Sequence, residues 1–256
     1  MSLIAVTAGK GAPGVTTTAV SLGAVWPRRA LVAECDPSGG DLVFRFRDSK
    51  GRPLAQDRGL LSLATRVRSG LAPDDVWQHT QTLAGGLDVL VGPSSPVQTT
   101  AMAMTWRPLA GLLARLGDAD VIADCGRLDT AAPTLEAITA ADLVVVLARA
   151  TAEGAAHLRS AVQVITDLPG RKDQAWVGVV VLADPRDDRA VGEVEQVLLG
   201  WSLTTRVLGR LAVDPVGAAG LRGEWGRRLD RAPLVESARV LARDLDQVLA
   251  DSHQAA

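Results

Sequence analysis

Several residue types and patterns are scarce in this chain of 256 residues, and each shortage argues against a class of function. Lysine occurs three times among 27 basic residues, so arginine supplies almost all the positive charge, and the arginine count alone says little about function. A net charge of −2 argues against a dedicated nucleic-acid-binding protein, although it leaves room for a local basic patch. No apolar run reaches the roughly 18 residues of a membrane-spanning helix.

Cysteine and histidine are equally sparse. Cys35 and Cys125 lie far apart and match no metal-binding spacing, so we expect both to pack as small apolar residues in a reduced, cytoplasmic protein. His79, His157 and His253 have no metal spacing and no neighbouring nucleophile pattern, which favours surface or packing positions. The N-terminus enters a strand pattern at once and lacks the layout of a signal peptide.

What the chain does contain is an alternation of short apolar runs with helical patterns, for example over residues 99–116 and 151–168. Several runs are continuous, as expected for strands that are buried on both faces of a parallel sheet. The prediction is an α/β fold with a single doubly wound, mainly parallel sheet and helices on both faces, spanning residues 1–251 as one domain before a frayed tail at 252–256. The apolar runs are 3–8, 30–35, 87–91, 121–125, 143–147, 177–182 and 206–211.

The most distinctive segment is the glycine-rich loop at residues 9–17, between the first apolar run and a helical pattern. A strand, a loop and a helix start place backbone N–H groups where they favour a phosphate. In the P-loop pattern a glycine, four residues and a second glycine precede Lys and Ser or Thr; Gly9, Gly14 and Thr16 fit it, and Thr16 is expected to bind Mg²⁺. Val15 stands where the lysine belongs. An ordinary glycine-rich turn is the alternative.

Two aspartates follow later apolar runs. Asp36 comes after the run 30–35, and Asp124 closes the run that begins at Val121. A carboxylate at the carboxyl end of a parallel strand lies at the rim where ligands bind. We therefore expect Asp36 and Asp124 to lie at the rim of such a site. The alternative for Asp36 is a simple turn, because Pro, Ser and Gly follow it.

Together these motifs resemble those of the ParA/MinD family of P-loop ATPases, which carry a deviant Walker A loop. The resemblance implies that Lys10 is the family's signature lysine, which reaches across a face-to-face dimer to the partner's nucleotide. It also implies that Asp36 orients the attacking water or the Mg²⁺ shell, so that Lys10 and Asp36 are the catalytic residues. The sequence departs from the family at Val15, at Pro13, which removes an N–H donor, and at Glu34, where the family has an aspartate.

The resemblance continues into the C-terminal half. It implies that Asp184, Asp214 and Pro215 lie beside the base, although capping or turn roles are at least as good an interpretation of the two aspartates. The order Asp-x-Gly-Arg from Asp124 to Arg127 resembles the CpaE/TadZ-like pilus-assembly group. The full set of expected nucleotide-binding residues is Gly9, Lys10, Gly11, Ala12, Pro13, Gly14, Val15, Thr16, Thr17, Asp184, Asp214 and Pro215, with Thr16, Asp36 and Asp124 at the metal.

The resemblance thus implies a protein that binds ATP or ADP with Mg²⁺ and acts as a homodimeric switch that positions or regulates a larger assembly, such as pilus or secretion machinery. A charge-assisted hydrogen bond contributes on the order of 1.5–3 kcal/mol, so the valine at position 15 implies weak ATPase activity at most. One alternative is a non-hydrolysing pseudo-ATPase scaffold for protein contacts. Another is a DNA-partitioning ATPase.

The segment from Arg222 to Arg243 carries an excess of three positive charges and is the candidate DNA contact. A solvated helix face is the favoured interpretation, so DNA is a possible partner but not the expected one. The closing helix at 233–250 lacks a basic amphipathic membrane tail and carries Asp244 and Asp246 near its end. Direct membrane insertion is therefore not expected.

Overall fold

A computed structural model describes residues 1–11, 13–67, 70, 72–172, 175–201, 203, 205–223 and 229–254. Its strands are β1 (Leu3–Ala8), β2 (Ala30–Glu34), β3 (Gln81–Thr82), β4 (Asp88–Leu90), β5 (Asp120–Arg127), β6 (Leu143–Arg149), β7 (Trp176–Ala183) and β8 (Arg206–Ala212). They form one sheet in the order β3-β4-β2-β5-β1-β6-β7-β8. Neighbouring strands run parallel, except for β3 and β4 at one edge.

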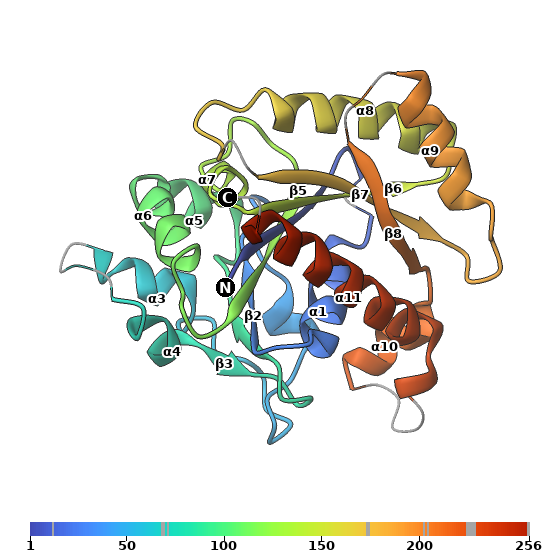
Figure 1. Cartoon of the computed structure of the whole chain (residues 1–256). Coiled ribbons are helices and arrows are strands. Elements are labelled where there is room, and N and C mark those ends of the chain that lie inside the picture. Colours follow the sequence, from blue (N-terminus) through green and yellow to red (C-terminus); the bar gives the residue numbers. More distant parts are fainter. Residues whose placement is uncertain are drawn as a thin grey trace.

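Helices cover both faces of the sheet. They are α1 (Val15–Val25), α2 (Leu42–Arg45), α3 (Leu60–Ala64), α4 (Asp75–His79), α5 (Pro96–Ala101), α6 (Ala103–Leu113), α7 (Leu135–Thr139), α8 (Ala152–Thr166), α9 (Ala190–Gly200), α10 (Pro215–Leu221) and α11 (Pro233–Gln254), with a 3₁₀ helix η2 (Leu229–Arg231). Figure 1 shows α8 and α9 on one face and α1 and α11 on the other. The predicted fold class is therefore confirmed.

The central strand β1 shows why the continuous apolar runs form the middle of the sheet. All six of its residues are buried, and successive side chains of a strand point to opposite faces. Leu3 and Ala5 accordingly pack in the core on the α8 side, whereas Ile4 and Val6 pack in the core on the α1 and α11 side. Each face of the sheet thus buries one half of the same run.

The structure differs from the sequence expectation in three elements. The antiparallel strand β3 has two residues, too few to produce a period in the sequence. The helical pattern 99–116 is two helices, which meet at Met102, where ψ of 9° leaves the helical range. The closing helix α11 extends to Gln254, beyond the predicted end at residue 250; the Ser252 hydroxyl donates to the Leu249 carbonyl.

The cysteines and one histidine occupy the packing positions expected of them. Cys35 and Cys125 are buried free thiols in the core on the α8 side. His79, at the end of α4, shares a hydrogen bond of 2.7 Å between its Nδ1 and Ser62 Oγ. The side chain of His253 lies outside the described residues.

A buried carboxylate joins four segments at the amino-terminal end of the sheet. Asp120, the first residue of β5, accepts hydrogen bonds from the Ser2 N–H (2.7 Å) and the Trp26 indole N–H (2.8 Å). It also accepts two from the Arg28 guanidinium, at 3.0 and 2.6 Å. Arg28 in turn pairs with Asp246 on α11. This cluster fastens β1, the α1–β2 turn, β5 and α11 together, away from the carboxyl ends of the strands.

Candidate functional site

The glycine-rich loop leaves the carboxyl end of β1 and enters α1. Gly11 and Gly14 have φ of +88° and +67°, a backbone region that side chains with a Cβ avoid, so both positions require glycine. The Gly14 carbonyl accepts the backbone N–H of Thr18 at 2.8 Å, which starts the helix. Ala12 lies outside the described residues. The loop therefore places the N-terminus of α1 at the carboxyl end of the central strand β1, as a phosphate site requires.

Val15 does not line the concave side of this loop. Its side chain is 2% exposed and packs in the apolar cluster that includes Val6 and Leu182. Lys10 is exposed and makes no hydrogen bond or ion pair within the part of the chain that the structure describes. The loop thus carries its positive charge at its start, and its buried valine is part of the core.

Asp124 lies in β5 directly beside Glu34 of β2. It is 1% exposed; Oδ1 accepts the Gly126 N–H at 3.2 Å, whereas Oδ2 has no hydrogen-bond partner among the residues that the structure describes. Burial raises the pKa of Asp124 to about 7, and the charges of Glu34 and Asp36 act in the same direction. The Thr16 hydroxyl lies close enough to oppose this rise, although it makes no hydrogen bond to Oδ2.

An unpaired buried carboxylate oxygen beside a threonine hydroxyl fits a hard cation such as Mg²⁺. This ion prefers oxygen ligands, retains several waters and is usually bound by one or two carboxylates together with substrate phosphates. Among the described residues no group of three His, Cys, Asp or Glu side chains is arranged to hold a metal by itself. Asp124 and Thr16 would therefore hold Mg²⁺ jointly with water and phosphate.

Asp36 is half-buried next to the end of β5. Its Oδ1 accepts the Ser38 N–H at 2.8 Å, so the turn that the sequence offered as the alternative for Asp36 is present. Burial raises the pKa of Asp36. Gly126, with φ of +53°, makes the approach possible, because a Cβ there would lie 2.1 Å from Asp36 Oδ2. Asp36, Asp124 and the glycine-rich loop between β1 and α1 thus meet at one end of the sheet.

Glu34 has a different role from its neighbours. It is 1% exposed, and its Oε1 accepts the N–H groups of Asp41 (2.7 Å) and Leu42 (2.8 Å). Its Oε2 accepts the Gly92 N–H at 2.9 Å. Burial raises the pKa of Glu34, and the three backbone N–H groups oppose the rise. Both oxygens are occupied, so the residue holds the loops after β2 and β4 in place.

Glu34→Gln is expected to destabilise the fold by about 1–3 kcal/mol, because an amide NH₂ would face backbone N–H donors and leave at least one of them unpaired. Urea unfolding followed by circular dichroism measures the change. The control is Glu195→Gln on the exposed face of α9, which should stay within about 0.5 kcal/mol. An equal, small effect of both substitutions would contradict the role assigned to Glu34.

The two aspartates expected near a base make local backbone contacts. Asp184 Oδ1 accepts the Arg186 N–H at 2.9 Å. Asp214 caps α10 through the Gly217 N–H at 2.9 Å and accepts the Leu234 N–H at 3.4 Å. These are the turn and capping roles that the sequence also allowed. A contact of Asp184, Asp214 or Pro215 with a base stays a prediction.

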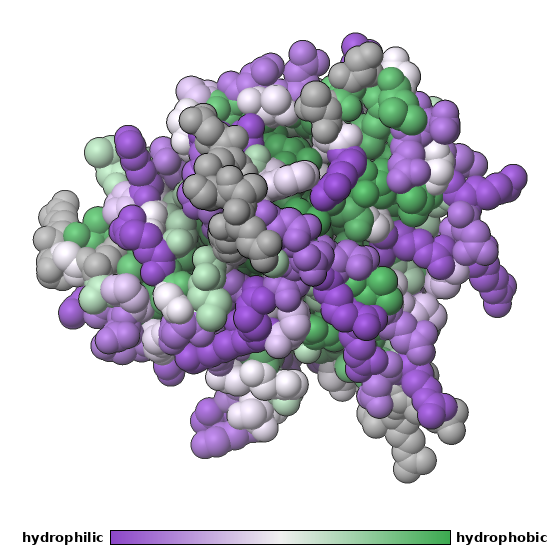
Figure 2. Space-filling view, in the orientation of Figure 1, coloured by the Kyte–Doolittle hydropathy of each residue, from purple (hydrophilic) through white to green (hydrophobic). Residues whose placement is uncertain are grey.

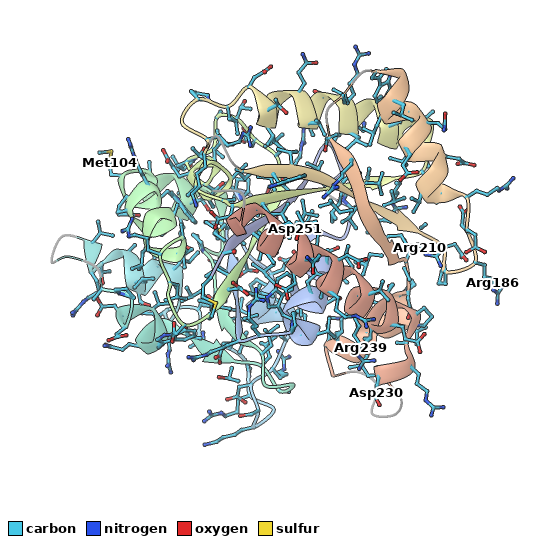
Figure 3. All side chains as sticks on the ribbon, viewed as in Figure 1. Met104, Arg186, Arg210, Asp230, Arg239 and Asp251 are labelled. Atoms are coloured by element: carbon cyan, nitrogen blue, oxygen red, sulfur yellow. The ribbon has the colours of Figure 1, made fainter. Side chains whose placement is uncertain are left out.

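The loop after β7 is held by an arginine from the neighbouring strand. Arg210 of β8 donates to the Asp187 carbonyl at 2.9 Å and approaches Asp188 at 3.3 Å; Figure 3 shows Arg210 with Arg186 at this corner. The Val213 N–H donates to the Ala183 carbonyl at 2.8 Å. The carboxyl ends of β7 and β8 are therefore joined.

An open pocket of about 500 Å³ adjoins the start of the glycine-rich loop between β1 and α1. Its lining comes from the loop itself, the turn after β2, the end of β5 and α8, and includes Gly9, Lys10, Pro37, Arg127, His157 and Ser160. Neither Arg127 nor His157 was expected at a site from the sequence. The position of Arg127, three residues after Asp124, could have indicated it, whereas no sequence pattern marks His157, which packs against Gly9.

The arginine-rich segment uses some of its side chains internally. Arg239 donates to the Asp230 carbonyl at 2.7 Å, and Arg243 to the Arg239 carbonyl at 3.2 Å; Figure 3 shows Arg239 beside Asp230. Figure 2 shows a mainly hydrophilic surface over α11 and an apolar area near α9 and β8. These contacts suit a solvated helix face. Glu224, Trp225, Arg227 and Arg228 lie outside the described residues.

No protein-family model and no curated protein matches the sequence. Solved structures do match. A ParA family ATPase from Chlorobium tepidum TLS superposes with a TM-score of 0.72 at 11% identity, covering 95% of this chain and 98% of that one. This chain has the ParA/MinD fold. None of the helices in the described ranges is long and apolar enough to cross a bilayer.

Two further ParA/MinD-fold structures contain nucleotide. The septum site-determining protein MinD from Pyrococcus horikoshii OT3, complexed with Mg-ADP, has a TM-score of 0.67 at 15% identity and 97% coverage of both chains. An ATP complex of a Cyanothece McdA variant has a TM-score of 0.69 at 19% identity and 96% coverage of both chains. The similarity extends over nearly the whole length of this chain.

Proposed function

We propose that this chain binds ATP or ADP with Mg²⁺ at the loop between β1 and α1. The observation that carries the proposal is the buried Asp124 carboxylate, whose second oxygen lacks a partner in the described part of the chain and lies beside the Thr16 hydroxyl. Gly9–Thr17 hold the phosphates, and the base lies near Asp184, Asp214 and Pro215. The Mg-ADP and ATP complexes of the two similar structures support this assignment.

The bound nucleotide serves a homodimeric switch that positions or regulates a larger assembly. Support comes from the fold shared with a septum site-determining protein, and the Asp124–Arg127 motif favours pilus or secretion machinery as the assembly. Lys10 and Asp36 act on the terminal phosphate. Hydrolysis is slow, because the lysine position of the loop is occupied by a valine in the core.

Thr16→Val is expected to lower the affinity for Mg-nucleotide about tenfold or more while leaving the metal-free affinity nearly unchanged, because valine keeps the shape and removes the oxygen ligand. Isothermal titration with ADP and ATP, each with Mg²⁺ or with EDTA, measures the difference. Thr100→Val, on the exposed face of α5, is the matched control. An absence of heat at millimolar nucleotide with the unmodified protein would overturn the proposal and favour a non-hydrolysing scaffold.

The DNA-partitioning alternative is tested separately. It requires ATP-dependent, salt-sensitive binding to non-specific DNA. A mobility-shift assay at low salt that shows no complex with or without ATP removes it.

A further inference from the structure

The site has a shortage of positive charge. Three carboxylates, Glu34, Asp36 and Asp124, lie at the carboxyl ends of β2 and β5 around the phosphate loop. Lys10 is the loop's lysine, and Val15 is buried in the core. A bound triphosphate adds several negative charges to this region. Mg²⁺ held by Asp124 and Thr16 would offset part of this charge, and a second cationic side chain close to the loop would offset more of it.

Arg127 occupies a fixed place next to the loop. As the last residue of β5, it lies beside Ala8 of β1, and the following Leu128 N–H donates to the Ala8 carbonyl at 2.9 Å. The preceding Gly126 carbonyl accepts the Thr7 hydroxyl at 3.0 Å. The backbone that carries the guanidinium is thus held on both sides, one residue from the start of the phosphate loop.

The Arg127 side chain is exposed and makes no hydrogen bond or ion pair within the described ranges. Other arginines are paired, for example Arg45 with Asp41 at 2.9 Å. Asp129 lines the same pocket as Arg127, but its Oδ1 already accepts the Ala131 N–H at 2.9 Å. The guanidinium is therefore available to an anion that enters the pocket shared with Lys10.

The order of the strands indicates which group of a nucleotide reaches this pocket. The base is assigned to the ends of β7 and β8, on one side of β1, and the phosphate loop follows β1 itself. Arg127 and Pro37 line the pocket from the ends of β5 and β2, on the other side of β1, and His157 and Ser160 line it from α8, which follows β6. Because Gly9 and Lys10 of the loop also line the pocket, a phosphate that extends beyond the loop, away from β7 and β8, would face it.

We propose that Arg127 binds the terminal phosphate and replaces the positive charge that the loop lacks at Val15, so that the site selects a nucleoside triphosphate over a diphosphate. A guanidinium suits this task because it stays charged and donates two parallel N–H bonds to phosphate oxygens. The inference rests on the proposed function, since it assigns one residue within the same site.

Arg127→Ala is expected to weaken Mg-ATP binding about ten- to a hundredfold and Mg-ADP binding less than threefold, and Arg127→Lys should fall between. Isothermal titration of the full chain with both nucleotides measures this, and a non-hydrolysable ATP analogue excludes turnover. The matched control is Arg107→Ala: Arg107 is exposed on α6, away from the loop after β1, and does not line the pocket. Thermal melts verify that all variants are folded.

Two results overturn the inference. If Arg127→Ala lowers the affinities for ATP and ADP by the same factor, or lowers neither, Arg127 does not contact the terminal phosphate. The proposal that the unmodified protein binds nucleotide is unaffected by that result. If the unmodified protein binds neither nucleotide, the proposed function fails and the inference fails with it.

Discussion

Asp124→Asn is expected to remove most of the Mg²⁺-dependent affinity for nucleotide while it stabilises the nucleotide-free protein at pH 8. Asparagine keeps the size of the side chain but is a weaker ligand for a hard cation than a carboxylate. In the absence of metal the same carboxylate destabilises the folded state, because it is 1% exposed and one of its oxygens has no hydrogen-bond partner among the described residues. A binding residue that destabilises its own fold is a usual feature of functional sites.

The gain in stability should depend on pH in a defined direction. Burial raises the pKa of Asp124 from its ordinary 3.8 to about 7. Between these values the folded state holds a proton that the unfolded state has released, so the free energy of unfolding falls as the pH rises from about 4 to about 7. The asparagine of the variant does not titrate. The difference in free energy of unfolding between the variant and the unmodified protein should therefore be near zero at about pH 4, increase through this window and become constant above about pH 7.

Thermal melts in EDTA at several pH values test the gain in stability, and nucleotide titrations with and without Mg²⁺ test the loss of Mg²⁺-dependent affinity. Asp118→Asn is the control, since Asp118 is 53% exposed and pairs with Arg29 at the surface. Retained Mg²⁺ dependence in Asp124→Asn would remove Asp124 from the metal site. A stability difference that does not change with pH would contradict the raised pKa.

Asp120→Ala is expected to destabilise the protein by about 3 kcal/mol or more without a specific effect on nucleotide affinity. The substitution leaves the N–H groups of Ser2 and Trp26 without their acceptor in a buried region, and it breaks the ion pair with Arg28. The Arg28 side chain is 40% exposed, so water recovers part of its loss and most of the cost comes from the two buried donors.

Urea unfolding measures this cost, and Asp118→Ala provides the comparison at the surface, with an expected change below about 1 kcal/mol. A double-mutant cycle with Trp26→Phe should return a coupling energy of about 1 kcal/mol between Trp26 and Asp120. Additive single effects, or an Asp120→Ala variant as stable as Asp118→Ala, would show that the cluster does not fasten the sheet.

Much of the fold was predictable because the central strands are long and buried on both faces. The runs 3–8, 143–147 and 177–182 are nearly pure aliphatic sequence, and each lies within a strand of the sheet. The edge strand β3 and the break at Met102 were not predictable, because two residues carry no period and the helical pattern continues across the break. Their structure depends on neighbours that are distant in sequence.

The site was predictable only in part. The spacing of Gly9, Gly14 and Thr16 and the positions of Asp36 and Asp124 after apolar runs placed these residues at one end of the sheet, where the structure has them. Sequence alone did not reveal that the Glu34 carboxylate accepts three backbone N–H groups. These donors lie in the segments after β2 and β4, and no sequence pattern around Glu34 predicts them.

The sequence by itself determined the α/β class and the glycine-rich loop between β1 and α1, because strand burial, glycine conformation and loop-to-helix spacing are local properties of the chain. Tertiary structure decided which charged side chains are free to bind a ligand. It buried Val15 in the core, left one Asp124 oxygen unpaired and placed Arg127 beside Lys10 at the same pocket. These outcomes depend on which strands become neighbours, and the order β2-β5-β1 brings together residues more than a hundred positions apart.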